Sequence, residues 1–380
     1  MKTVLHVIDQ GGPGGAQKVF VDLAAGLDRS DWHSIPVVPG PGWVADELRS
    51  RGLEPVFAPI SGKGFDLRYL ARLMSLTSGR RVDLVHTHLL GPAVYGSIAG
   101  LARSLPVVST FHGQVDIAAD ERFSRAKFGI LNRGACALVF VSDRLRQFYL
   151  STTTLRADRA VVIHNGVNFR APGATRVVNQ PLRAELGVGP DDVLVGAIGH
   201  LRPAKAYDVF LHAAAELRRR SSRFRFVIVG LPEGTVLEEL TALREQLGLA
   251  DAMTFSGFRP DIRPVLDALD VYVITSSTEG FSLSLVEAMG QGVPTVATRC
   301  GGPEEIVAND VTGLLVPVGD PEAISEAIAY LTSHPEVSSR IASSAEHSVR
   351  ERFSMQQMLS SYSDLYAGCL NTRSGPWGNS

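Results

Sequence analysis

Short runs of β-branched and apolar residues recur along the first 140 residues, and each run ends at glycine, proline or polar residues. Stretches with the spacing of amphipathic helices separate them, such as residues 16–27 and 92–102. This alternation is typical of βαβ units, in which a parallel sheet is buried on both faces. The predicted strands of this first set are Val4–Ile8, Ile35–Val38, Leu84–His86, Val107–Thr110 and Leu138–Val141.

The same alternation starts again after residues 169–181, a segment rich in turn-forming residues that lacks sustained periodicity. A length of 380 residues also agrees with two domains. We therefore predict two doubly wound parallel-sheet domains with a ligand site in a cleft between the carboxyl edges of their sheets. The predicted strands of the second set are Val193–Ile198, Phe224–Val229, Met253–Ser256, Val271–Ile274, Thr295–Ala297 and Gly313–Val316.

These patterns also set the expected domain boundaries. Hydrophobic residues make up 45% of the chain, which is enough for packed cores and argues against disorder. The predicted parts are an N-terminal domain over residues 1–168, a linker over 169–182, a C-terminal domain over 183–350, a helix over 351–370 that packs back toward the N-terminal domain, and a flexible tail over 371–380.

Charge is divided unevenly between the two halves of the chain. The formal net charge of −2 argues against a nucleic-acid binder that relies on bulk positive charge. Residues 1–170 hold 20 Lys and Arg against 14 Asp and Glu, whereas residues 171–380 hold 17 against 25. The basic first half suits an anionic surface or acceptor, although a chance distribution explains the asymmetry equally well.

The cysteine pattern and the hydropathy bear on the compartment. Cys136, Cys300 and Cys369 are odd in number and far apart, so we predict neither a disulfide framework nor a zinc site. A reducing cytoplasm is the expected location. No run of about 18 apolar residues occurs, which predicts no membrane span and leaves peripheral membrane contact open.

Two motifs of the first half follow predicted strands. In GGPGGAQ (Gly11–Gln17), glycines let the backbone approach a ligand, and the helix start favours negative charge. The segment fits a dinucleotide-binding motif poorly, because Gln17 stands where that motif has its third glycine. A tight strand-to-helix turn without a ligand is the alternative. In STFHGQ, His112 could donate to a substrate hydroxyl or phosphate. His86 and His88 lie at a similar strand end, where they could line an acceptor site or bond to the backbone.

The motif GHLRPAKAYD (Gly199–Asp208) again joins a strand to a predicted helix. Arg202 and Lys205 are three residues apart, a spacing that brings both cations to one side of a helical turn. Together with the helix amides they could hold a diphosphate. A solvated pair of charges is the alternative interpretation.

The most specific motif is STEGFSLSLVEAMGQGVPTVATRCGGPEEIV (Ser277–Val307). Glu279 precedes a helix that we expect to begin around Ser282 or Ser284, and Glu287 lies about one turn into it. The helix start offers unpaired amides to a phosphate, with a carboxylate on either side for sugar hydroxyls. This pattern indicates a nucleotide-sugar site, although Ser284 and Glu287 also match a capping box.

At these residues the chain resembles the retaining, nucleotide-sugar-dependent glycosyltransferases of family 4. Their GT-B fold consists of two Rossmann-like domains that face each other across a cleft. The resemblance covers nearly the whole chain, and its most telling element is the pair of glutamates eight residues apart. The motifs that occur in family order are GGPGGAQ, FHG, HNGVN (His164–Asn168), GHLRPAK, EGFSLSLVEAMGQGVP and GGPEEIV.

The resemblance also implies roles for individual residues. Glu279 would face the donor sugar, and Glu287 would bond the nucleotide ribose. Lys205 would hold the diphosphate, while TFSGFR (Thr254–Arg259) stands where the family recognises the base. The implied catalytic residues are His112, Glu279, Arg202 and Lys205. The implied donor-binding residues are Gly14, Gly15, Gly199, Arg202, Lys205, Phe258, Glu279, Phe281, Ser282, Leu283 and Glu287.

The chain departs from the family pattern at three places. His200 stands where an arginine is common, so we assign the diphosphate contact to Arg202, two residues later. Ala206 replaces the usual glycine after the lysine, and Gln17 replaces a common glutamate of the first motif. With these changes, Arg202 and Lys205 are still expected to hold the diphosphate.

The resemblance implies transfer of a sugar from a UDP- or GDP-sugar to an acceptor hydroxyl with retention of configuration. The departing phosphate would accept the acceptor proton, and Arg202, Lys205 and the helix start near Ser282 would stabilise its growing charge. The chain contains no Asp-x-Asp triplet to bind a metal diphosphate. We therefore expect no metal site, no obligatory divalent ion and no other cofactor.

The acceptor class is less constrained: a glycan, a lipid-linked molecule or a small molecule, in glycan, glycolipid or exopolysaccharide biosynthesis. Residues 121–133 and 143–148 could rest on anionic lipid through apolar neighbours and six cations, or form an ordinary solvated face. Those cations are Arg122, Arg125, Lys127, Arg133, Arg144 and Arg146. Other readings are a sugar-nucleotide epimerase of the same architecture, a glycogen-synthase-like polymerase and a regulator that binds a nucleotide sugar without turnover.

Overall fold

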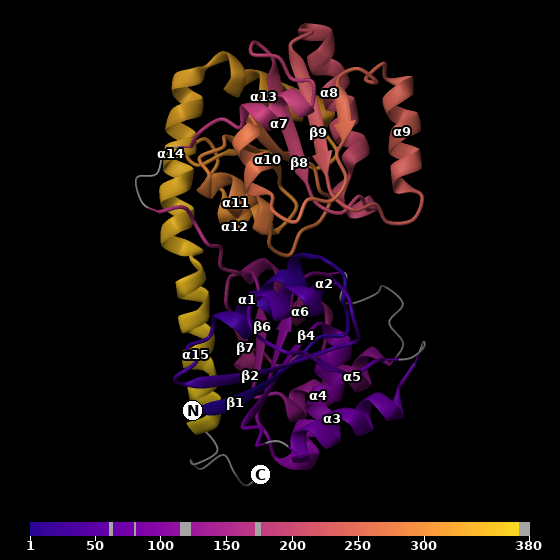
Figure 1. Cartoon of the computed structure of the whole chain (residues 1–380), viewed down its shortest axis with the longest axis vertical. Helices are drawn as coiled ribbons and strands as arrows, with labels where there is room; N and C mark the ends of the chain where they lie inside the picture. The colour runs from indigo at the N-terminus through magenta and orange to yellow at the C-terminus, as the bar shows by residue number, and fades with distance from the viewer. Residues whose placement is uncertain (61–63, 80, 115–122, 172–175, 372–380) are drawn as a thin grey trace. The chain divides into compact units, whose positions relative to one another are not determined.

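The computed structural model describes residues 1–60, 64–79, 81–114, 123–171 and 176–371. The chain forms two compact units (Figure 1). Unit 1 contains Met1–Gly166 and Met355–Ser380, and unit 2 contains Val167–Ser354. The described part of segment 169–182, predicted as a linker, is assigned to unit 2, where α7 (Gln180–Glu185) begins.

Unit 1 is built on a seven-stranded parallel sheet with the strand order β3-β2-β1-β4-β5-β6-β7. Its strands are β1 (Lys2–Val7), β2 (Trp32–Val38), β3 (Val56–Phe57), β4 (Leu84–His88), β5 (Val107–Phe111), β6 (Ala137–Phe140) and β7 (Ala160–Val162). Its helices are α1 (Gly15–Gly26), α2 (Trp43–Ser50), α3 (Leu67–Gly79), α4 (Leu90–Arg103), α5 (Ser124–Gly134), α6 (Asp143–Thr152) and α15 (Met355–Asn371).

Unit 2 contains a six-stranded parallel sheet with the order β10-β9-β8-β11-β12-β13. Its strands are β8 (Val193–Ile198), β9 (Phe224–Val229), β10 (Met253–Phe255), β11 (Val271–Ile274), β12 (Thr295–Thr298) and β13 (Leu314–Val316). Besides α7, its helices are α8 (Tyr207–Arg220), α9 (Val236–Gln246), α10 (Arg263–Ala268), α11 (Leu283–Gly290), α12 (Gly302–Ile306), α13 (Pro321–Ser333) and α14 (Pro335–Arg352).

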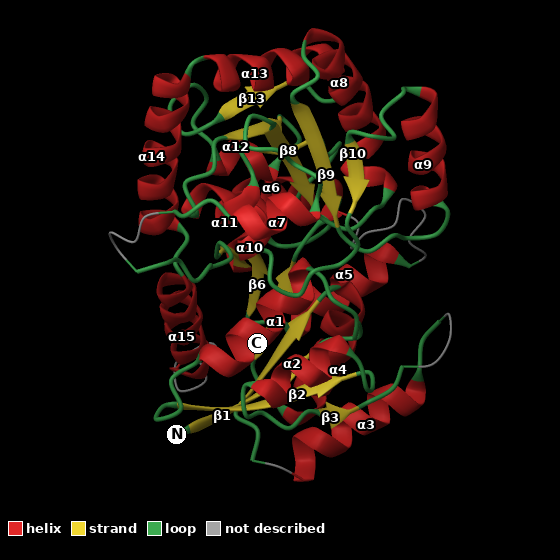
Figure 2. Cartoon of the chain, turned by 45° about the horizontal axis from the view of Figure 1, so that its top comes forward, coloured by secondary structure: helices red, strands yellow, loops and turns green. Residues whose placement is uncertain are grey.

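These two parallel-sheet α/β units confirm the predicted fold class, and Figure 2 shows the strands among their covering helices. In unit 1, Leu5 and Val7 of β1 pack with α3, whereas Ile8 packs with α1 and α2 on the other face. Alternate side chains of a strand point to opposite faces, so a sheet covered on both sides needs apolar residues at nearly every position. That requirement explains why the predicted runs coincide with the observed strands.

The C-terminal helix α15 belongs to unit 1. Trp32 of β2 donates from its indole Nε1 to Ser363 Oγ on α15 at 2.9 Å. The hydroxyl of Tyr366 lies 2.6 Å from His86 Nδ1, and the hydroxyl of Tyr362 lies 3.1 Å from Thr110 Oγ1. Buried polar contacts therefore fix this helix against β2, β4 and β5. None of the helices in the described ranges is long and apolar enough to cross a membrane.

The prediction that no disulfide is available was wrong. Cys136, directly before β6, forms a disulfide with Cys369 of α15, and their Cα atoms lie 6.2 Å apart. The two residues are 233 positions apart, and the return of α15 to the unit 1 sheet brings them together. The third cysteine, Cys300, is buried and free in unit 2. An odd number of distant cysteines therefore did not exclude one long-range pair.

Cys369→Ser is expected to lower the free energy of unfolding of unit 1 by about 2–4 kcal/mol, because the bond restricts the unfolded chain. Urea unfolding followed by tryptophan fluorescence, to which Trp32 beside α15 contributes, measures this loss. A reductant should lower the stability of the wild type to a similar level and leave Cys369→Ser unchanged. Equal stability of the oxidised wild type and the variant would contradict a stabilising disulfide.

Candidate functional site

The candidate residues of unit 2 gather where the strand order reverses. The chain passes from β8 to β9 on one side of the sheet and from β11 to β12 on the other, while β8 and β11 are neighbours. Gly199 directly follows β8, and Glu279 lies five residues after β11. Doubly wound sheets bind ligands at the carboxyl ends of strands at such a reversal. The topology therefore brings two motifs, about 80 residues apart, to one edge.

An ion pair joins these two motifs. Lys205 Nζ lies 2.5 Å from Glu279 Oε1, and their side chains are only 14% and 8% exposed. Ser276 donates its hydroxyl to the same carboxylate oxygen at 2.8 Å. A Cβ atom on Gly199 would lie 2.9 Å from Lys205 Cε, so glycine lets the lysine side chain cross the strand end. Sequence reasoning missed Ser276, whose only signal is its place three residues before Glu279.

The carboxylate of Glu279 is ionised in this environment. Burial alone would raise its pKa, but the charge of Lys205 and hydrogen bonds from Lys205 and Ser276 outweigh that effect. The charge of Arg202 acts in the same direction, and the pKa of Glu279 is lowered overall. The backbone of Glu279 is held as well, because its N–H donates to Cys300 O and its carbonyl accepts from Gly302 N. The site thus holds a fixed negative charge beside two cations.

The predicted helical turn around Arg202 and Lys205 is instead a short 3-10 turn, Pro203–Lys205, and α8 begins only at Tyr207. Ala206 separates the two with a left-handed backbone, φ 47° and ψ 49°. This conformation costs an L-residue roughly 1–2 kcal/mol, which explains why glycine is usual there. The 3-10 turn still places Lys205 and Arg202 where both charges act on Glu279.

His200 and Arg202 differ in what they contact. His200 Nδ1 lies 3.1 Å from Glu233 Oε1. The Nε of Arg202 is buried and has no hydrogen-bond partner among the described residues. Arg202 therefore retains a donor within the site, whereas the ring of His200 is paired with a carboxylate outside it.

Helix α11 begins at Leu283, and Ser282 is its N-cap residue without a side-chain capping bond. The first amides of a helix lack intrahelical partners, so this start is open to an acceptor. Ser284 lies inside the helix and contacts Tyr272 and the carbonyl of Ile198, which excludes the alternative Ser284–Glu287 capping box. Glu287 is half-buried and lies one turn into α11, as the spacing predicts.

Two candidate aromatic residues lie in different surroundings. The side chain of Phe281 is 8% exposed and its ring lies edge-on to Phe353 at 5.2 Å, so it belongs to the core. Phe258 follows β10 and is 37% exposed, which leaves its ring accessible at the carboxyl edge of the same sheet.

In unit 1, the glycine-rich segment forms the turn from β1 into α1. Gly14 is the N-cap residue of α1, and Gly15 is the first helical residue. The amide of Gln17 folds back over Gly14, where a Cβ atom would lie 2.3 Å from Gln17 Oε1. Gln17 also donates to Gln10 Oε1 at 2.7 Å. A side chain at position 14 would displace the amide end of Gln17 from this turn.

His112 follows β5 at the carboxyl edge of the unit 1 sheet. Its Nε2 lies 2.9 Å from Nδ1 of His88, the last residue of β4. Burial lowers the pKa of His112 to about 3, so the ring is neutral near pH 7. His88 was considered in the sequence only as a residue that lines the acceptor side or bonds to backbone; its contact with His112 depends on the pairing of β4 with β5.

Within the described ranges one group of side chains meets the distance criterion for a metal site: His6, His86 and His88, with one nitrogen of each within 4.8 Å of the others. His86 already uses both ring nitrogens, one toward Tyr366 and the other toward Thr110. It would have to give up one of these bonds to become a ligand.

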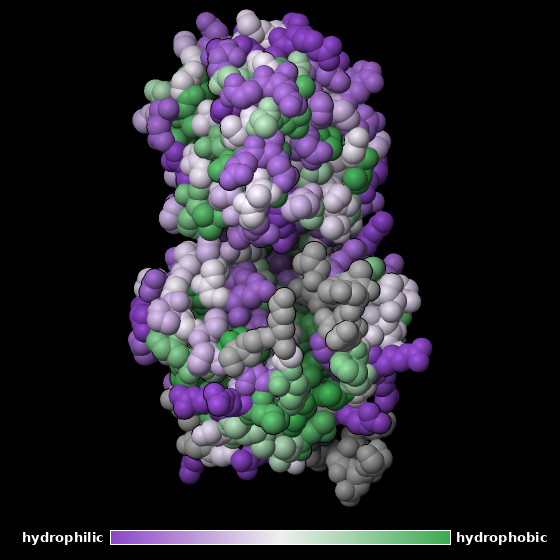
Figure 3. Space-filling model, turned by 90° about the vertical axis from the view of Figure 1, so that its right-hand side faces the viewer, coloured by the Kyte–Doolittle hydropathy of each residue, from purple (hydrophilic) through white to green (hydrophobic). Residues whose placement is uncertain are grey.

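The basic segment 121–133 includes α5. This helix exposes fewer apolar side chains than the sequence predicted. Phe128 is only 2% exposed and packs inward, and α5 lies against α4. Phe123, which is 79% exposed, is the apolar residue that projects beside Arg125. Figure 3 shows apolar residues gathered on one face of unit 1, in the lower half of the view. Arg122 of the predicted cationic set lies outside the described residues.

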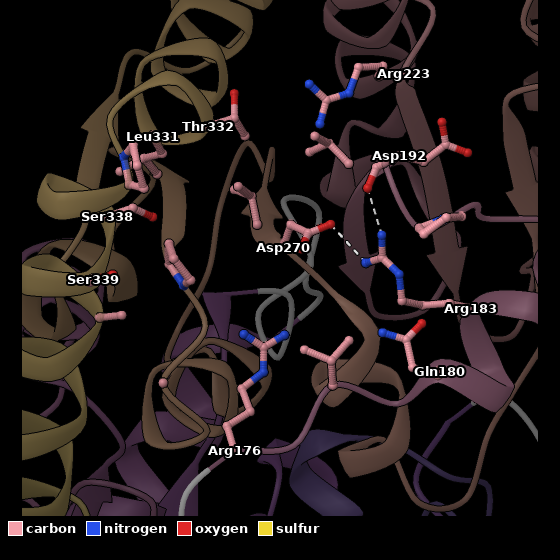
Figure 4. Close-up of a pocket in the computed structure, with 18 residues that line it drawn as sticks. Arg176, Gln180, Arg183, Asp192, Arg223, Asp270, Leu331, Thr332, Ser338 and Ser339 are labelled. Carbon is pink, nitrogen blue, oxygen red and sulfur yellow. Dashed lines mark hydrogen bonds and ion pairs between the residues drawn. The ribbon is translucent and has the colours of Figure 1, made fainter.

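A cavity of about 520 Å³ in unit 2 lies at the amino ends of β8 and β11, the sheet edge opposite Glu279. Figure 4 shows Arg183 pointing between Asp270 and Asp192. Arg183 donates to Asp270 Oδ2 at 2.8 Å and to the carbonyl of Asp192 at 2.6 Å. Arg176 donates to the carbonyl of Leu266. These arginines attach residues 176–183 to α10 and to the residues that precede β8 and β11.

Two family models match the chain. Residues 13–170 match Glycosyltransferase Family 4, and residues 178–348 match Glycosyl transferases group 1. The D-inositol 3-phosphate glycosyltransferase of Saccharomonospora viridis is 32% identical over 312 residues, which cover 75% of this chain and 69% of that protein. The protein of the same name from Segniliparus rotundus is 29% identical, over 85% of this chain and 74% of that protein.

Solved structures that are similar to this chain agree with the two family models. Anabaena HepE in complex with UDP has 25% identity and a TM-score of 0.83, covering 97% of this chain and 100% of HepE. Sucrose-phosphate synthase from Thermosynechococcus elongatus, at 18% identity and a TM-score of 0.77 over 98% of this chain and 100% of that chain, shares the fold. The two-sheet architecture is that of a GT-B glycosyltransferase. The chain belongs to glycosyltransferase family 4.

Proposed function

We propose that this protein transfers a sugar from a UDP- or GDP-sugar to an acceptor hydroxyl with retention of the anomeric configuration. The observation that carries the proposal is the buried Lys205–Glu279 pair at the β8–β11 reversal. Beside it, the Nε of Arg202 has no hydrogen-bond partner in the described part of the chain. A diphosphate needs cations and open amides, and a sugar needs a fixed carboxylate. In unit 2 the cations, the amides and the carboxylate all lie at the carboxyl ends of the strands.

In the proposed reaction, the bond between the anomeric carbon and the phosphate oxygen breaks while the acceptor oxygen bonds to the same face of that carbon. The acceptor proton moves to the departing phosphate oxygen. The negative charge that grows there is stabilised by Arg202, Lys205 and the amides of Phe281, Ser282 and Leu283. These groups are already oriented before the reaction, so no solvent has to reorganise. Glu279 orients the sugar.

The remaining donor contacts are assigned to the nucleoside. Glu287, one turn into α11, accepts from the ribose hydroxyls, and the accessible ring of Phe258 packs near the base. Gly14 and Gly15 provide backbone amides at the start of α1. UDP is favoured over GDP as the nucleotide because the similar HepE was solved with UDP.

For the acceptor we propose a phosphorylated polyol first, because the similar proteins are named D-inositol 3-phosphate glycosyltransferases. The excess of Lys and Arg in residues 1–170 suits such an anion. A lipid-linked glycan held at an anionic membrane is the second acceptor, favoured by exposed Phe123 beside Arg125. The two acceptors differ in whether anionic vesicles are needed.

The test combines labelled UDP-glucose, UDP-N-acetylglucosamine and GDP-mannose with inositol 3-phosphate or with lipid-linked glycans in anionic vesicles. We expect a UDP-sugar and inositol 3-phosphate to give a glycoside whose anomeric carbon keeps the α configuration of the donor, as read by proton NMR. A β-linked product would contradict retention. Conversion of the donor sugar without any acceptor would favour an epimerase instead.

Transfer is expected to persist at an unchanged rate in excess EDTA. The cationic groups at Lys205 and Arg202 take the place of a metal at the diphosphate, and the chain has no Asp-x-Asp triplet. The measurement compares initial rates after dialysis against EDTA with rates after addition of Mg²⁺ or Mn²⁺. Activity that disappears in EDTA and returns only with the metal would contradict this prediction.

A further inference from the structure

The cavity of about 520 Å³ in unit 2 is separate from the proposed sugar-transfer site. It lies at the amino ends of β8 and β11, whereas Lys205 and Glu279 lie at the carboxyl edge of the same sheet. Its volume is in the usual range for sites that hold small molecules. The charged residues that line it are Arg176, Arg183, Arg223, Asp192 and Asp270. The cavity therefore has one more cation than it has carboxylates.

Both aspartates of the cavity are already paired with arginines. Asp270 Oδ2 accepts from Arg183 Nη1 at 2.8 Å, and Asp192 Oδ2 lies 3.5 Å from Nε of Arg225. Arg183 is buried, and its other terminal nitrogen donates to the carbonyl of Asp192. The negative charge of each aspartate is thus balanced by one arginine, and Arg225 is not itself a lining residue.

Arg176 and Arg223 have no carboxylate of their own. Within the described ranges, neither guanidinium forms an ion pair. Nη2 of Arg176 donates to the carbonyl of Leu266 in α10, and Nε of Arg223 donates to the carbonyl of Asp191. Burial lowers the pKa of Arg176, although nearby aspartates act in the opposite direction. A guanidinium that is partly withdrawn from water and lacks an anion is stabilised when an oxyanion binds to it.

Figure 4 shows how the side chains face this cavity. Arg176 points into it from the segment that leads to α7, and Arg223 enters from the opposite side of the view. Ser338 and Ser339 of α14 lie across from Gln180. Among the described residues, the side chains of these three polar residues have no hydrogen-bond partner. The cavity therefore combines two cations with neutral donors that are not used elsewhere in the described fold.

We propose that this cavity binds a small molecule through an oxyanion, either a phosphate or a carboxylate group, with Arg176 as the main cation. A guanidinium recognises both groups through two parallel hydrogen bonds. The hydroxyls of α14 and the amide of Gln180 donate to the remaining oxygens. Apolar side chains of β8, β11 and α13 offer surface to the body of the ligand. The exposed Arg223 adds a second positive charge.

The direct test measures binding to the full chain by calorimetry in 0.1 M NaCl. The probes are inorganic phosphate, glucose 1-phosphate and citrate, with uncharged glucose as the blank. We expect saturable binding of at least one of the three oxyanions and none of glucose. Phosphate and glucose 1-phosphate without citrate would identify a phosphate group, and citrate alone would identify a carboxylate. No binding of any of the three would overturn the proposal.

Arginine variants locate the bound oxyanion. Arg176→Gln should weaken Kd by at least about tenfold, because a hydrogen-bonded charge is lost from a partly buried position. Arg223→Gln should weaken it by less than about fivefold, since its guanidinium is exposed and well hydrated. Arg219→Gln, at an exposed position of α8 outside the cavity, is the matched control and should keep the wild-type Kd. Equal Kd for Arg176→Gln and the wild type would overturn the proposal.

A second pair of variants leaves Arg176 in place, because Arg176 also attaches its segment to α10. Ser339→Asp puts a negative charge on the wall of the cavity and should abolish binding of the oxyanion. Ser339→Asn has nearly the same size without the charge and should retain binding. Equal Kd for these two variants would contradict an oxyanion in the cavity.

The proposed diphosphate site at the other sheet edge is the rival location for the oxyanion. Arg202→Gln removes a cation from that site and should leave the Kd of the oxyanion unchanged. Binding that is lost in Arg202→Gln and kept in Ser339→Asp would place the oxyanion at the diphosphate site and overturn the proposal. None of these measurements requires sugar transfer, so they test the cavity even if the proposed function fails.

Discussion

Lys205→Ala is expected to lower kcat for sugar transfer by about 100- to 1,000-fold, the usual loss when one preorganised group that stabilises a developing negative charge is removed. Lys205 acts twice in this site. It faces the proposed diphosphate, and it lies 2.5 Å from Glu279, whose charge it stabilises. Initial rates with a UDP-sugar at saturating concentration measure the loss.

A loss of stability must be separated from this catalytic effect. Removing Lys205 leaves the 8% exposed carboxylate of Glu279 without its main partner, which costs about 3–5 kcal/mol in buried pairs. The double variant Lys205→Met with Glu279→Gln removes both charges and should recover most of the stability while remaining inactive. Lys2→Ala, which breaks the exposed pair with Asp83, is the matched control and should retain full activity. A folded and fully active Lys205→Ala would show that the site is assigned wrongly.

Acidification from pH 7 to pH 5 is expected to destabilise unit 1 strongly. Burial lowers the pKa of His6 and His112 to about 3, and the pKa values of His86 and His88 also lie well below 6.5. In the unfolded chain all four bind protons below pH 6.5, whereas in the folded chain they remain neutral. Each therefore contributes stability that is fully present above 6.5 and is lost as the pH falls, by about 1.4 kcal/mol per pH unit.

Asp9 opposes this trend in part. Burial raises its pKa to about 6, so the folded state keeps a proton there that the unfolded state releases above 3.8. Its contribution is present at low pH and is lost as the pH rises through 6. One carboxyl therefore offsets about one of the four histidines, and the net effect of acid remains destabilising.

Urea unfolding at pH 7, 6 and 5 measures this dependence. His6→Gln should reduce the slope of stability against pH by about one proton, because a buried amide does not titrate. His33→Gln, at an exposed position of β2, should keep the wild-type slope. Stability that is the same at pH 5 and pH 7 would contradict four neutral buried histidines.

The sheets could be predicted from the pattern because both of their faces are covered. Strands β8, β9 and β11 begin and end at the predicted residues, since each is a continuous apolar run. The two short edge strands β3 and β7 were missed, whereas the equally short edge strands β10 and β13 were predicted. The pattern thus identified every long strand of the two sheets and two of their four short edge strands.

The candidate residues could be found from motifs, but their contacts could not. Lys205 and Glu279 were singled out separately, and only the adjacency of β8 and β11 brings them together. Cys136 and Cys369 pair through the return of α15, which neither cysteine parity nor spacing reveals. The contact of His88 with His112 depends on the pairing of β4 with β5. Local sequence therefore predicted the elements of the site, and the order of the strands determined its pairs.

Whether the unit 2 site transfers sugar from a sugar nucleotide is tested most directly by comparing the wild type with Glu279→Gln, a substitution that keeps the shape of the side chain and removes its charge. Both are incubated with a UDP-sugar and inositol 3-phosphate, and the glycoside is quantified and its anomeric configuration read by NMR. We expect an α-linked product from the wild type and a rate at least about 100-fold lower from the folded variant. Equal rates for the two proteins, or a wild type that forms no glycoside from any sugar nucleotide and acceptor tested, would contradict the account.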